Sequence, residues 1–190
     1  MAKRNESIRR LTLGAMLTAL VVVLQLVGSV IKLGPFSISL VLIPIVIGAA
    51  TCGPYIGGWL GLAFGATVLI SGDAAIFLQF NAPATILVVL VKGIACGLLA
   101  GLAYRVLERV NKWLAVLVAA VVCPLVNTGV FLLGCSLFFM GLIEQWAAGG
   151  NVIAYMFVGL VGFNFLFELI FNLVLSPVVV RLLNIRKKQN

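Results

Sequence analysis

The sequence predicts an all-α integral membrane protein with six transmembrane helices and both termini in the cytoplasm. Of its 190 residues, 63% are apolar and only 9% are charged, whereas a soluble domain is about half apolar and a quarter charged. Several apolar runs reach the roughly 20 residues that cross a bilayer as a helix. The basic residues flank these runs, which is how positive charge is distributed at the cytoplasmic ends of transmembrane helices.

Six apolar segments divide the chain, which we treat as one membrane domain over residues 1–190. The second segment is short, carries Pro44 and ends at the turn signal Gly53-Pro54. It is either a short span or a re-entrant segment paired with the third. The last two segments exceed the thickness of a bilayer, so we expect them to tilt, kink or protrude. The expected spans are 11–31, 37–52, 54–71, 84–104, 113–140 and 152–183.

The basic residues predict the orientation. With six spans and a cytoplasmic N-terminus, eleven Lys and Arg residues lie at cytoplasmic ends and only Lys32 lies outside. This bias satisfies the positive-inside rule, and an odd number of spans would place one strongly basic terminus outside. The cytoplasmic clusters are Lys3, Arg4, Arg9 and Arg10; Arg105, Arg109 and Lys112; and Arg181, Arg186, Lys187 and Lys188.

Several classes of function are not expected. The net charge of +8 is placed around apolar runs, so no nucleic-acid partner is predicted. Four cysteines lie in or beside apolar runs without a C-x-x-C pair, and the chain has no His, so we expect no disulfide framework, metal site or cofactor. An enzyme needs a nucleophile with its base or a carboxylate cluster. Because Glu168 is the only acid expected inside a span, no enzyme is predicted.

Glycine recurs every four residues in two of the expected spans. This spacing puts the glycines on one stripe of each helix, where missing side chains let two backbones approach closely. The stripes serve either packing within one bundle or assembly with another subunit. They consist of Gly53, Gly57, Gly61 and Gly65 in the third span, and Gly93, Gly97 and Gly101 in the fourth.

Most of the chain resembles one family of membrane proteins. After Arg9-Arg10, the first span presents Ala15 and Ala19 one helical turn apart. The runs 42–49, 57–65, 91–94 and 124–129 are also similar to that family. On these segments the chain resembles the substrate-binding (S) component of an energy-coupling factor (ECF) vitamin transporter.

The resemblance implies a function and partners. An S component binds a small vitamin outside the cell and delivers it with a transmembrane T component and two cytoplasmic ATPases. It implies that Ala15 and Ala19 form the docking face for the T component, and that the protein lies in a bacterial cell membrane. The sequence has no G-x-x-x-x-G-K-[ST] phosphate loop of its own. The alternative function is a self-sufficient secondary transporter or channel.

Polar residues inside the expected spans are the first candidates for substrate binding, because each needs a partner or a role there. Asn164, Glu168 and Asn172 recur every four residues and form one stripe that should face the bundle. In one interpretation Lys92 neutralises an anionic substrate, and Asn127 and Asn164 donate or accept hydrogen bonds. In the other, Lys92 and Glu168 form a structural salt bridge.

The external segment 73–83 is the second candidate. It is an apolar loop in this prediction, with the amides of Gln79 and Asn81 and the ring of Phe80 among its side chains. Such a composition suits a lid over a small amphipathic ligand, or a loop that dips into the lipid headgroups. A buried Lys with amide neighbours slightly favours a small carboxylate such as pantothenate, with riboflavin or folate next.

Overall fold

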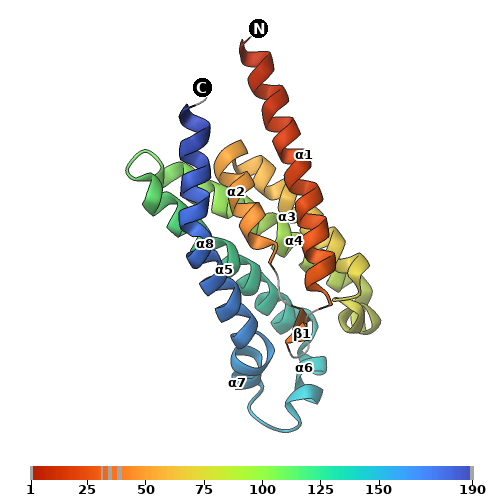
Figure 1. Cartoon of the computed structure of the whole chain (residues 1–190). Coiled ribbons are helices and arrows are strands. Elements are labelled where there is room, and N and C mark those ends of the chain that lie inside the picture. The colour runs from red at the N-terminus through yellow and green to blue at the C-terminus, as the bar shows by residue number, and fades with distance from the viewer. Residues whose placement is uncertain (1, 31, 34–35, 38–39, 189–190) are drawn as a thin grey trace.

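The computed structural model describes residues 2–30, 32–33, 36–37 and 40–188, and Figure 1 shows a bundle of long helices. After the first helix, β1 and β2 form an antiparallel hairpin in which Leu33 pairs with Phe36. A π-helix, η1 (Tyr155–Leu160), precedes the last helix. The other elements are α1 (Ala2–Gly28), β1 (Lys32–Leu33), β2 (Phe36–Ser37), α2 (Leu42–Cys52), α3 (Pro54–Ser71), α4 (Ala75–Leu107), α5 (Lys112–Phe138), α6 (Met140–Ala147), α7 (Val152–Ala154) and α8 (Gly162–Lys188).

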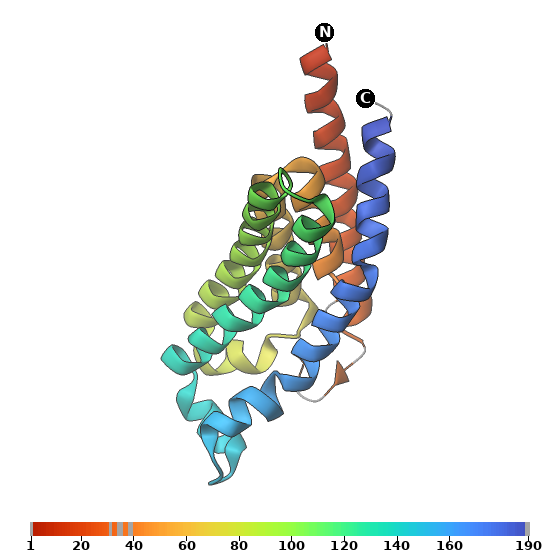
Figure 2. The ribbon, with the colours of Figure 1, turned by 90° about the vertical axis from the view of Figure 1, so that its left-hand side faces the viewer.

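The two ends of the bundle differ. The N- and C-termini lie at one end, which we call the terminal end, and β1, α6 and α7 lie at the opposite one, the hairpin end (Figures 1 and 2). The turn between α4 and α5 also lies toward the terminal end. The start of α1, this turn and the end of α8 carry the three basic clusters, so the basic residues gather at the terminal end.

Length and surface composition identify an all-α membrane protein, which confirms that part of the prediction. Large apolar side chains cover the outside: Leu11 is 74% exposed, Ile70 81% and Phe163 76%. Lipid accommodates such a surface, whereas water disfavours it. Within the described residues, five helical stretches are long and apolar enough to cross a membrane: Ile8–Gly28, Pro54–Ser71, Ala75–Leu107, Lys112–Phe138 and Val152–Arg181.

The glycine stripes pack α3 directly against α4. A Cβ atom added at Gly61 would overlap the carbonyl oxygen of Gly93, and one added at Gly57 would lie 2.5 Å from that of Gly97. Close backbone approach of this kind is what small residues permit in membrane helices. These four glycines therefore serve packing within the chain, the first of the two interpretations above.

Two turns fix how the short α2 and the long α3 are joined to their neighbours. Gly53 has φ = 103°, and Pro54 follows it in the first turn of α3, where its missing N–H has no helical partner. Gly72 ends α3 in the left-handed region at φ = 86°, a conformation that glycine adopts without steric cost. The second turn leads into the segment that carries Asp73.

The expected loop over residues 73–83 is helical for most of its length, which corrects the prediction. α4 begins at Ala75, and its helical geometry breaks at Asn81 (φ = −154°, ψ = 90°). The Oδ1 atom of Asn81 accepts a hydrogen bond from the N–H of Ala84 at 3.3 Å, and its carbonyl accepts one from the hydroxyl of Thr85 at 2.8 Å. Asn81 thus caps the second part of α4, with Pro83 in its first turn.

The last expected span, 152–183, is also interrupted. η1 separates α7 from α8, and Val161 between η1 and α8 leaves helical geometry (φ = −120°, ψ = −16°). A π-helical segment accommodates extra residues in a helix and often lies at a functional site. Here the break precedes Asn164, which faces the interior of the bundle.

Candidate functional site

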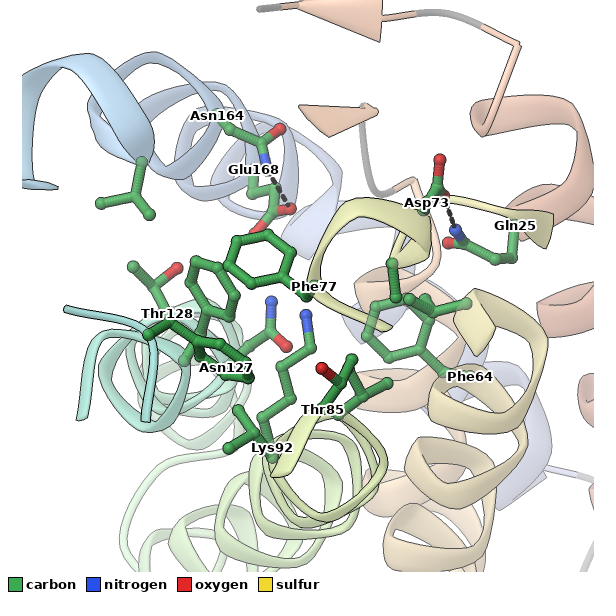
Figure 3. Close-up of a pocket in the computed structure, with 17 residues that line it drawn as sticks. Gln25, Phe64, Asp73, Phe77, Thr85, Lys92, Asn127, Thr128, Asn164 and Glu168 are labelled. Carbon is green, nitrogen blue, oxygen red and sulfur yellow. Dashed lines mark hydrogen bonds between the residues drawn. The ribbon is translucent and has the colours of Figure 1, made fainter. Parts of the chain in front are cut away.

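A cavity of about 70 Å³ lies between α1, α3, α4, α5 and α8. A water molecule needs about 10–15 Å³ of such space, so the cavity has room for several. Aromatic rings and aliphatic side chains form most of the wall, among them Phe64, Phe77 and Phe131. Polar side chains converge on it from every side (Figure 3). These are Gln25, Asp73, Thr85, Lys92, Asn127, Thr128, Asn164 and Glu168.

Lys92 contributes the cation of this cavity. It lies in α4 directly before Gly93, which belongs to the glycine stripe, and its side chain points into the cavity (Figure 3). The ammonium nitrogen is 5.6 Å from the ring centroid of Phe64 and 5.3 Å from that of Phe131. Cations are attracted to aromatic faces at such distances. The rings therefore hold the charged end of Lys92 between α3 and α5.

Two carboxylates line the cavity, and each accepts a hydrogen bond from an amide. Asn164 Nδ2 donates to Glu168 Oε1 at 3.1 Å within α8, which is the four-residue neighbour relation read from the sequence. Gln25 Nε2 of α1 donates to Asp73 Oδ2 at 2.6 Å, and Ser71 also donates to this oxygen at 3.3 Å. Glu168 is 2% exposed and Gln25 1%.

Asn127 enters the cavity from α5. Its side chain is only 5% exposed, and its Oδ1 atom has no hydrogen-bond partner in the described part of the chain. α5 continues past Pro124 as one helix, and Asn111 caps its start: the Asn111 side chain accepts hydrogen bonds from the N–H groups of Trp113 and Leu114. A capped, continuous helix thus fixes the depth of Asn127 in the bundle.

Phe77 covers one side of the cavity. It lies in the first part of α4, is 5% exposed, and meets three other rings edge-on. The ring-centroid distances are 5.6 Å to Phe131, 5.0 Å to Phe139 and 5.8 Å to Trp146. Aromatic pairs favour such edge-to-face contacts. The segment after Asp73 is therefore packed onto α5 and α6 through Phe77.

The predicted substrate-binding residues separate into two groups. Lys92, Asn127 and Asn164 line the cavity together. The others lie outside its wall: Gln79 is exposed, Phe80 is 47% exposed with its ring 6.4 Å from that of Phe139, and Asn81 caps α4. Their role in substrate binding stays a prediction, and the geometry gives it no contact with the cavity.

The rest of the polar lining consists of Glu168, which the sequence placed on the stripe of α8, and of four residues that the sequence analysis did not single out for binding: Gln25, Asp73, Thr85 and Thr128. For Gln25 a signal exists in the sequence, since it is an amide within a long apolar run, and such residues are costly in a membrane unless they have a partner or a role. Asp73 was assigned to the outside, and its contact with Gln25 spans 48 positions of the chain.

The two predicted docking residues lie on the outer surface of α1. Ala15 and Ala19 are both exposed, whereas Leu17 and Val21 on the same helix are buried in the bundle, at 8% and 0% exposure. Met16 beside them is 65% exposed. The face of α1 that carries Ala15 and Ala19 is thus turned away from the other described helices.

A family model matches most of the chain. Its description is "ECF transporter, substrate-specific component", and it matches residues 9–180. None of the curated proteins and none of the solved structures matches the chain. The matched range includes all of the residues that line the cavity, as well as Ala15 and Ala19.

Proposed function

The chain belongs to the family of ECF transporter substrate-specific components, and on that premise we propose that it is a high-affinity vitamin-binding S component. It is a transport protein of the cell membrane with several membrane-crossing helices. In our proposal it captures a small vitamin outside the cell and delivers it with a T component and two cytoplasmic ATPases.

One observation carries the proposal at the level of the site. The half-buried cation of Lys92 and the amides of Asn127 and Asn164 converge on one cavity under an aromatic cover. Apolar walls with a few convergent polar groups are typical of sites for small organic ligands. We therefore assign substrate binding to these three residues.

We propose six membrane crossings, with the terminal end in the cytoplasm and residues 1–190 as one membrane domain. The five long stretches and α2, which has 11 residues, together make an even number of crossings. An even number agrees with termini at the same end of the bundle (Figure 1), and a re-entrant α2 would make the number odd. The basic clusters at the terminal end favour the cytoplasmic side for it, so the hairpin end faces the outside.

Pantothenate is our slightly favoured substrate, with riboflavin and folate next. Lys92 suits a carboxylate, and the surrounding amides suit hydroxyl and amide groups. Mass spectrometry of the small molecules retained by the purified protein tests this directly. A retained vitamin supports the proposal, and purification with a T component and two ATPases supports the partners.

Replacing both Ala15 and Ala19 with Trp is expected to abolish vitamin uptake by cells while binding by the isolated protein stays within about twofold. Two indole rings would hold a partner helix away from a face on which small residues permit close approach. Uptake assays and calorimetry on the purified variant measure the two effects. Normal uptake, or an equal loss of binding, would show that this face does not dock the T component.

The purified chain alone is expected to bind its vitamin without accumulating it. No P-loop is present in the sequence to supply energy from ATP. Liposomes that contain only this protein should therefore retain no vitamin against a concentration gradient, with or without a proton or sodium gradient. Accumulation driven by an ion gradient would instead support the alternative, a self-sufficient secondary transporter, and passive equilibration would support a channel.

A further inference from the structure

Three amide oxygens beside the cavity lack hydrogen-bond donors. Gln25 Oε1, Asn127 Oδ1 and Asn164 Oδ1 are buried, and none has a partner within the described part of the chain. All three residues line the same cavity. Buried acceptors are almost always satisfied in folded proteins, because an unmet one retains its full cost of desolvation. A molecule that occupies the cavity would therefore have to supply the hydrogen-bond donors for these three oxygens.

Neighbouring carboxylates fix the orientation of two of these amides. A carboxylate oxygen only accepts hydrogen bonds, so the amide nitrogen must face it. Gln25 therefore turns its Nε2 to Asp73, and Asn164 turns its Nδ2 to Glu168. Each amide oxygen is left for another donor. A flipped amide would place its oxygen against the carboxylate oxygen. The pairs Gln25–Asp73 and Asn164–Glu168 therefore each leave one amide oxygen as an acceptor without a donor.

Lys92, in contrast, needs a hydrogen-bond acceptor. Its ammonium group has donors and no acceptor, and it lies 5.6 Å from the ring centroid of Phe64 and 5.3 Å from that of Phe131. An aromatic face attracts the cation but accepts no strong hydrogen bond, so an anionic group beside Lys92 would gain a charge-assisted one. The cavity thus calls for an anion at α4 and for donors near α1, α5 and α8.

We infer that the substrate is an organic anion that carries at least two N–H or O–H donors, with its charge at Lys92 and its donors at Gln25 and Asn164. This inference rests on the proposed function and narrows its substrate class. The two carboxylates of the wall repel an anion, but their amide partners stand beside them and Lys92 offers the countercharge. The same carboxylates attract the donor groups of the ligand, which favours one orientation in the cavity.

Three small probes separate these requirements. Pantothenate has a carboxylate together with hydroxyl and amide donors, pantothenol has the donors without the carboxylate, and hexanoate has a carboxylate without the donors. Calorimetry on the purified full chain should show pantothenate binding at least about a hundredfold more tightly than either analogue. Folate, which also combines carboxylates with N–H donors, is the second probe of this class.

Variants test the individual acceptors. Asn164→Leu and Gln25→Leu should each weaken binding of pantothenate, or of folate where that is the probe that binds, by about tenfold or more. The matched control Gln145→Leu removes an exposed amide of α6 and should leave the affinity within about twofold. The melting temperature of each variant without ligand shows whether it is folded. If Gln25→Leu does not fold, Asn164→Leu provides the test, since Asn164 is only half-buried.

Other outcomes overturn the inference. Tight binding of riboflavin or pantothenol would show that the ligand needs no carboxylate. Tight binding of hexanoate would show that it needs no hydrogen-bond donors. Unchanged affinity in both Leu variants would mean that water alone satisfies the amide oxygens, and failure of both anionic vitamins to bind would exclude the class. The proposed function is judged separately, since purification with a T component and two ATPases does not depend on which ligand binds.

Discussion

Replacing Lys92 with Met is expected to lower substrate affinity several hundred-fold. Met keeps a long apolar stem between Phe64 and Phe131 and removes the charge, so the variant isolates the electrostatic contribution. Loss of one member of a desolvated ion pair costs about 3–5 kcal/mol, and about 1.4 kcal/mol corresponds to a tenfold change in affinity. Calorimetry with the vitamin that the purified protein retains provides the measurement.

The salt-bridge interpretation of Lys92 predicts a different pattern. If Lys92 mainly neutralises Glu168, Lys92→Met should lower the melting temperature without ligand, and adding Glu168→Gln should restore it. Because both side chains line the cavity, either change could also affect binding. The single variant Lys92→Met and the double variant with Glu168→Gln are therefore compared in both affinity and melting temperature. Unchanged affinity with a lowered, restorable melting temperature would assign Lys92 to structure and remove the reason for an anionic substrate.

Replacing Gly61 or Gly93 with Ala is expected to destabilise the protein strongly. The added Cβ would overlap the backbone carbonyl of the facing glycine, which cannot rotate away as a side chain can. Overpacking costs about 1–3 kcal/mol, and we expect the upper end here. For a chain of this length that corresponds to a fall of about 6–12 °C in melting temperature.

Gly129 provides the matched control for these substitutions. It lies in α5, and a Cβ added there would meet nothing within 4 Å. Gly129→Ala should leave the melting temperature unchanged or raise it slightly, because Ala has the higher helix propensity. If Gly61→Ala melts like Gly129→Ala, the two helices do not pack as closely as the structure has them.

Much of the fold follows from local features of the sequence. The lengths of the apolar runs depend only on the composition of each segment. The glycine stripes of α3 and α4 depend only on a four-residue spacing. The hydrogen bond from Asn164 to Glu168 is of the same kind, since helical neighbours four residues apart lie on one face. These features are local, so periodicity predicts them without knowledge of the tertiary structure.

The segment around Phe77 shows where local reasoning stops. The sequence analysis predicted a loop over residues 73–83, yet residues 75–80 are helical and place Phe77 against Phe139 and Trp146. Burial among distant aromatic rings stabilises this turn of helix, and propensity alone is a weak guide when tertiary contacts compete with it. The π-helix before α8 was not predicted, because the spacing of apolar residues does not distinguish it from an α-helix.

The sequence by itself determined that this protein is an all-α membrane protein with basic residues beside its spans and polar residues within them, because lipid imposes those constraints on every segment separately. Only the tertiary structure decided which polar residues meet. Gln25 reaches Asp73 across 48 positions, and Lys92, Asn127 and Asn164 come from three helices. The packing of α3 on α4 and the turns at Gly53 and Gly72 set these relative positions, so the site depends on contacts between helices that no single segment encodes.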